Sequence, residues 1–140
     1  VHVKSRYARR EVEAEEHDRL FHAFSEAIGN FDIDALATVL ADDAVFLSDG
    51  GGKVSSTSRP LLGSARIAKA LIGFSRLTGD LGWRLTQARV NGMPGCLAWD
   101  RRSGGLLQTI ALSPSVTEPG RIGAVYIQRK PEKLRGLLPH

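Results

Sequence analysis

Cysteine, methionine and long apolar runs are scarce in this 140-residue sequence, which holds one cysteine and one methionine. The single thiol, Cys96, cannot form an internal disulfide, and in its alternating apolar segment it is predicted to pack as a small hydrophobic residue. The most apolar stretches, residues 45–47 and 106–112, are far shorter than the roughly 20 residues of a membrane span. With no signal sequence at the start, these absences predict a cytoplasmic protein that does not contact a membrane.

A large excess of one charge is also missing, since 19 basic and 15 acidic residues leave a net charge of only +4. The basic residues gather at the two ends of the chain. They are Lys4, Arg6, Arg9 and Arg10 at the start, and Arg129, Lys130, Lys133 and Arg135 at the end. We interpret them mainly as solvated terminal charges, with contact to a polyanion as the alternative.

Periodicity predicts one α+β domain in which helices precede strands. Apolar residues recur at helical spacing over residues 14–28, 33–40 and 64–79, with Asp32 as the cap of the second helix. Residues 44–47 are predicted to form a short strand. Four further strand-like runs, at 81–90, 95–101, 105–113 and 121–129, are separated by glycine-rich turns. We therefore expect three helices packed on a curved antiparallel sheet, followed by a short helical turn from Pro131.

Four local strings sharpen this interpretation. They are Asp49-Gly50-Gly51-Gly52-Lys53, the turn at 90–95, Tyr126-Ile127-Gln128-Arg129, and Lys130-Pro131-Glu132-Lys133-Leu134. In this order the strings resemble the C-terminal SnoaL-like (NTF2-like) extension of sigma-J-type extracytoplasmic-function sigma factors. Lys130 and Glu132 depart from that family's closing string, which has Asn and Asp there.

The resemblance implies a cone-shaped NTF2-like domain at 13–140, with residues 1–12 as a basic linker from an absent sigma region 4. The start at Val1 rather than at methionine agrees with excision from a longer chain. The domain would regulate transcription initiation by contacting sigma regions 2 and 4 of the same chain or the RNA polymerase core, and would meet promoter DNA only indirectly. The resemblance implies no cofactor and no catalysis, and leaves open a homodimer.

The resemblance assigns contact roles to two of the strings. The segment 49–53 would be a docking loop, because three glycines allow a sharp turn and close approach by another surface. The segment 130–134 would be a second contact, with Pro131 fixing the backbone and Leu134 as an apolar anchor. The alternatives are purely structural: a wide loop for the first, and the start of a surface helix for the second.

A stand-alone small-molecule-binding protein, or an enzyme like the polyketide cyclases and ketosteroid isomerases, is the second interpretation of the chain. Phe46, Phe74, Trp83 and Trp99 would then line a small apolar pocket, although such residues also make ordinary cores. A general base would have to be Asp42, Asp43 or Asp100, buried beside an acidic donor. Alternation along the strand places either Trp99 or Asp100 inside, but not both.

Metal binding has little support in the sequence. His17 and His22 lie on the first helix but point about 140° apart, and His2 and His140 are terminal.

Overall fold

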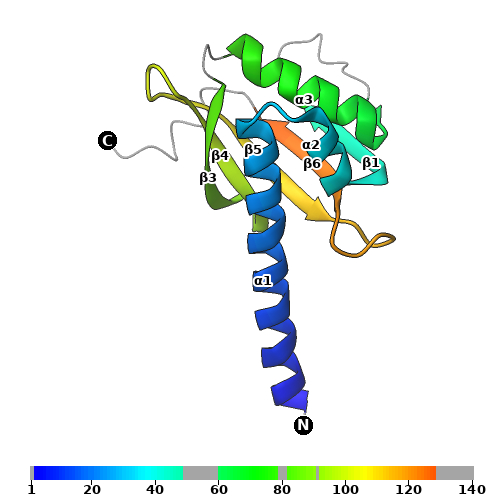
Figure 1. Ribbon diagram of the computed structural model, residues 1–140. Helices are drawn as coiled ribbons and strands as arrows, with labels where there is room; N and C mark the ends of the chain where they lie inside the picture. Colours follow the sequence, from blue (N-terminus) through cyan, green and yellow to red (C-terminus); the bar gives the residue numbers. More distant parts are fainter. Residues whose placement is uncertain (1, 49–59, 79–81, 91, 129–140) are drawn as a thin grey trace.

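The computed structural model describes residues 2–48, 60–78, 82–90 and 92–128, with side chains described from Ala14 onward (Figure 1). The elements in chain order are α1 (His2–Gly29), α2 (Ile33–Val39), β1 (Leu40–Ser48), β2 (Leu61–Leu62), α3 (Ser64–Thr78), β3 (Trp83–Val90), β4 (Met93–Asp100), β5 (Leu106–Pro114) and β6 (Ile122–Gln128). The predicted α+β class is confirmed. The predicted terminal turn from Pro131 lies outside the described residues.

The strands form a six-stranded sheet in the order β2-β1-β6-β5-β4-β3. Strands β3 to β6 make an antiparallel meander, as predicted, but β1 pairs with β6 in parallel. The expectation of a wholly antiparallel sheet is therefore wrong. Helix α3 separates β1 from the meander, so no tight turn fixes the direction of β1, and the periodicity of a strand carries no information about its partner.

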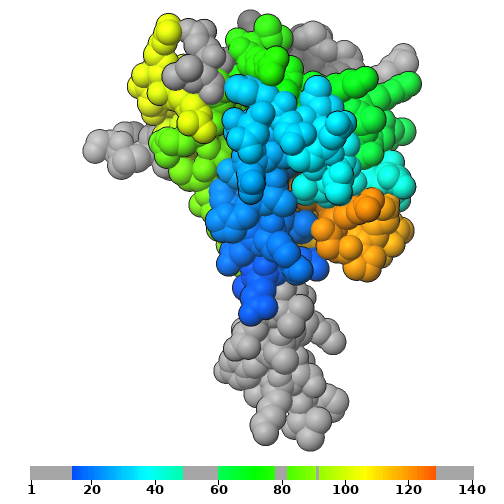
Figure 2. All heavy atoms as spheres, in the orientation of Figure 1, coloured from blue at the N-terminus to red at the C-terminus, as the bar shows by residue number. Residues whose placement is uncertain are grey.

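The three helices pack against one face of this curved sheet, which we call the inner face (Figure 1). In Figure 2 the described atoms of α1 and α2 lie side by side in front of the strands. The residues predicted to lie inside are all buried at the inner face, and they are Leu20, Phe24, Leu36, Ile67 and Leu71. Short α2 begins where predicted, because the N–H of Ala35 donates a 3.0 Å hydrogen bond to Asp32 Oδ1. One core therefore joins the helices to the sheet.

Helix α1 begins at His2, so the expectation that order starts only after residue 12 is wrong. Its first turns extend beyond the rest of the domain in Figure 1. Residues 2–13 lack a sustained apolar period, but half of them are Arg, Lys or Glu, which favour helix intrinsically. A search for amphipathic faces misses a helix of this kind because no recurring apolar positions in the sequence mark one side.

The string at 90–95 was predicted to be a turn, and it lies where β3 is followed by β4. Val90 pairs with Met93, and Gly92 has a positive φ of 78°. Gly95 lies inside β4, where a Cβ atom would collide with the carbonyl oxygen of Ile110 and lie 3.1 Å from Val90 Cγ2. The last glycine of the string is therefore required by strand packing.

We expect Gly95→Ala to lower the free energy of unfolding by about 1 to 3 kcal/mol, because the added methyl group meets a backbone atom that cannot move away. Gly73→Ala is the matched control, since α3 leaves open space around that position. It should instead raise stability by about 0.4 to 1 kcal/mol. Urea unfolding of both variants measures the two changes, and equal effects would contradict this account.

Cys96 is fully buried in the core, as predicted, and burial raises the pKa of its thiol to about 12. Because the thiolate is the reactive form, the folded protein should not react with Ellman's reagent at mildly alkaline pH, whereas the unfolded chain should react completely. Between about pH 8.5 and 12 the Cys96 thiol ionises in the unfolded chain but not in the folded protein. Ionisation therefore favours the unfolded chain, and the thiol's contribution to stability should fall as the pH rises toward 12. Rapid labelling of the folded protein would show that this part of the core opens.

Candidate functional site

The two predicted contact segments, 49–53 and 130–134, lie outside the described residues, but the strands that lead into them are neighbours. β1 ends at Ser48 and β6 ends at Gln128. In the parallel ladder Leu47 is opposite Tyr126, and Ser48 is opposite Ile127. Paired strands lie about 4.8 Å apart. The chain therefore leaves the sheet toward both segments from adjacent points at the same end.

The sheet face opposite the helices, which we call the outer face, also carries buried side chains. Along β5, Ile110 and Leu112 point inward and belong to the core, whereas Thr109 and Ala111 point outward. Ala111 and Val90 are only 6% and 9% exposed, yet neither belongs to the core cluster. These side chains form a second apolar layer on the outer face.

A hollow of about 380 Å³ opens in this second layer. The described residues that line it are Leu47, Ser48, Val90, Met93, Thr109, Ala111, Tyr126, Ile127 and Gln128. It lies beside the ends of β1 and β6, where the chain leaves for the two predicted contact segments. The sequence signal for it was the run 106–112, whose apolar residues occupy both alternating positions, as in strands covered on both faces.

Two buried polar groups have no hydrogen-bond partner in the part of the chain that the structure describes. One is the hydroxyl of Thr109, in the outer hollow, and the other is the side-chain N–H group of Gln108, on the inner face. Their residues are 3% and 1% exposed. A buried polar group without a partner costs about 1 to 3 kcal/mol. Of the two, only Thr109 lines one of the described hollows, so a molecule bound there can supply the missing bond.

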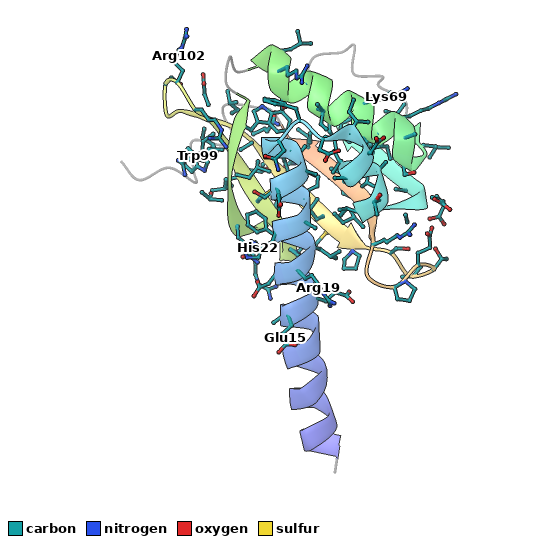
Figure 3. The ribbon with its side chains drawn as sticks, viewed as in Figure 1. Glu15, Arg19, His22, Lys69, Trp99 and Arg102 are labelled. Carbon is teal, nitrogen blue, oxygen red and sulfur yellow. The ribbon has the colours of Figure 1, made fainter. Side chains whose placement is uncertain are left out.

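The four aromatic residues predicted to line one pocket do not come together. Phe74 and Trp83 meet edge to face on the inner side, with ring centroids 6.4 Å apart, and Phe46 packs against the same core. Trp99 follows the opposite alternation, because Asp100 is the residue paired with Trp83. Its side chain points away from α1 (Figure 3). The single aromatic pocket is therefore wrong, and the inner three rings are core.

Trp99 is fixed on the outer face by two contacts. Its Nε1–H group donates a 2.8 Å hydrogen bond to Thr86 Oγ1. The guanidinium carbon of Arg84 lies 5.4 Å from the ring centroid, within cation–π range. Both partners come from β3, so Trp99 serves to bind β4 to that strand.

The three carboxylates considered as catalytic bases do not have a base's surroundings. The N–H of Arg102 donates a 2.9 Å hydrogen bond to Asp100 Oδ1, and this bond lowers the pKa of Asp100. Asp42 and Asp43 are exposed on β1. A general base near neutral pH needs its pKa raised by burial instead. The geometry at Asp100 stabilises the anion and does not poise it for proton transfer.

Among the residues described, no group of three or more His, Cys, Asp or Glu side chains is placed to hold a metal ion. Nor does any described helix combine the length and apolar character needed to cross a bilayer.

No protein-family model matches the chain, and no curated protein matches it either. Solved structures do resemble it. The extracytoplasmic function sigma factor SigJ of Mycobacterium tuberculosis superposes with a TM-score of 0.62 at 20% sequence identity. The likeness covers 93% of this chain and 48% of SigJ, so the chain spans about half the length of that protein.

Other similar structures are SnoaL-like proteins of full-domain size. One, of unknown function, from Burkholderia thailandensis, has a TM-score of 0.60 at 14% identity and covers 82% of this chain and 95% of its own. A proposed isomerase of the SnoaL-like family from Agrobacterium tumefaciens has a TM-score of 0.54 at 16% identity, with 83% and 98% covered. The fold of this chain is therefore the SnoaL-like, NTF2-like cone, which is shared by a sigma factor and by proposed enzymes.

Proposed function

We propose that this chain is a regulatory domain of an extracytoplasmic-function sigma factor. It modulates transcription initiation by contacting the sigma regions or the RNA polymerase core through the segments 49–53 and 130–134. Two independent observations support the proposal. The four sequence strings occur in the order of sigma-J-type factors, and SigJ shares the fold over 93% of this chain.

The parallel pairing of β1 with β6 is the observation that carries the proposal furthest. Because Ser48 is opposite Ile127 in this pair, the strands that lead to the two segments end side by side. Two contact segments that were merely structural would need no common origin. One partner surface can engage both when they leave the sheet together.

Helix α1 supplies a suitable connection to the rest of such a factor. It runs unbroken from His2 to Gly29, at about 1.5 Å per residue. A long helix transmits position better than a flexible linker does. In this proposal α1 sets the distance between the domain and the preceding sigma region, while the two segments make the regulatory contact.

The alternative is a stand-alone protein that binds a small molecule, and one observation favours it: the apolar hollow on the outer face. A catalytic version has no such support, because the hydrogen bond from Arg102 lowers the pKa of Asp100. The two functions are compatible, since a regulatory domain can also bind a ligand. The sigma-factor role is therefore tested on its own.

Replacing Asp49 and Lys53 by Ala in the full-length factor should weaken polymerase binding by about five-fold, if two exposed ion pairs of about 0.5 kcal/mol each are lost. We expect both side chains to be exposed, so melting of the 140-residue chain should change little, because substitutions at exposed sites usually stay within about 0.5 kcal/mol. Binding to core polymerase and transcription from a reporter promoter measure the first effect, and thermal unfolding measures the second.

The matched control is Asp42→Ala with Lys69→Ala, which removes one acid and one base from exposed positions on β1 and α3. This pair should leave polymerase binding unchanged. If both double variants behave like the wild type, segment 49–53 has no docking role. A native reading frame that encodes no sigma regions before Val1 would refute the sigma-factor assignment as a whole.

A further inference from the structure

The outer-face hollow has the size and walls of a ligand site. Sites for small molecules commonly occupy about 300 to 1,000 Å³ and are lined by apolar side chains with a few polar groups. This hollow measures about 380 Å³. Ala111 contributes only a methyl group, while the larger side chains of Leu47, Val90, Met93 and Tyr126 stand around it. A small residue among large ones leaves the space open.

Alternation across the paired strands explains why these side chains meet. Ala111 is opposite Tyr126 in the β5–β6 pair, and Tyr126 is opposite Leu47 in the β6–β1 pair. All three therefore point to the outer face in one row across the sheet. Val90 and Met93 reach the hollow from the two sides of the β3–β4 hairpin. The walls come from five strands, so the hollow is built into the sheet.

The polar groups that the described residues bring to the hollow are uncharged. None of the described residues that line it carries a charge. The hydroxyl of Thr109 is buried, lines the hollow, and has no hydrogen-bond partner among the described residues. A threonine hydroxyl can donate one hydrogen bond and also accept. A charged ligand would lose its hydration here without gaining an opposite charge from any of the described lining residues.

We propose that this hollow binds an uncharged, largely apolar small molecule with a single hydroxyl or carbonyl group, which pairs with the hydroxyl of Thr109. The site is distinct from the inner face of the sheet, where Phe74 and Trp83 are core. It does not depend on the sigma-factor assignment. If that assignment holds, the ligand lies against Leu47 and Tyr126, beside the points where the two contact segments begin.

Met93 makes the proposal directly measurable, because it is the only methionine in the chain and lines the hollow. A protein labelled with ¹³C at the methionine methyl group gives one signal from this site. Titration of the full chain with 2-naphthol should move that signal in a saturable way. Naphthalene, which lacks only the hydroxyl group, should bind about five-fold more weakly, the factor that one net hydrogen bond provides.

Thr109→Val tests the role of the hydroxyl, since valine keeps the shape of threonine and removes its polar group. The two probes should bind this variant equally well, and its melting temperature should not fall, because an unpaired buried hydroxyl is lost. Thr86→Val is the matched control on the same face. Its hydroxyl already accepts a bond from Trp99 and does not line the hollow, so the five-fold preference should persist.

Three results would overturn the proposal. The first is a Met93 signal that neither probe moves, as expected if residues of the chain itself already fill the hollow. The second is a Met93 signal that shifts on dilution of the protein alone, which would mean that a second copy occupies the site. The third is an unchanged preference for 2-naphthol in Thr109→Val.

Discussion

The apolar layer between the helices and the inner face of the sheet is the interaction on which the rest of the structure depends. Phe24 and Leu71 enter it from the helices, and Trp83, Ile110 and Val125 enter it from the strands, each at most 1% exposed. Burying one such side chain stabilises the fold by roughly 1.5 to 3 kcal/mol. Because this layer fills the inner face, the sheet itself meets other molecules on its outer face and at its strand ends.

Features that arise within one element could be predicted from the sequence. The cap at Asp32, the buried positions of α3 and the burial of Cys96 follow from short-range spacing and all hold in the structure. The parallel pairing of β1 with β6 could not be predicted, because it joins residues far apart in the chain. The early start of α1 was missed for a different reason, since residues 2–13 show no sustained apolar period in the sequence.

The candidate site was predicted only in part. The strings at 49–53 and 130–134 were recognised by resemblance, and their structural roles stay predictions. The pocket was misplaced, because aromatic residues were grouped by type although alternation puts Trp99 and Trp83 on opposite faces of the sheet. The outer hollow depends on side chains from five strands, and among those described only Tyr126 is aromatic; the register of the strands brings them together. The pattern of residues within one strand therefore does not predict that these side chains come together.

The ladder between β1 and β6 also fixes how the domain can be perturbed. A shift of one residue between these strands would turn Leu47 toward the core and Phe46 toward the outer face. Such slippage would break the apolar layer on one side and the wall of the hollow on the other. Two chain segments separated by most of the sequence are thus locked to a single register. Moving one of these segments while the other stays in place requires the strands to unpair locally, because they cannot slide past each other. The hydrogen bonds between β1 and β6 therefore set how tightly the two segments are coupled.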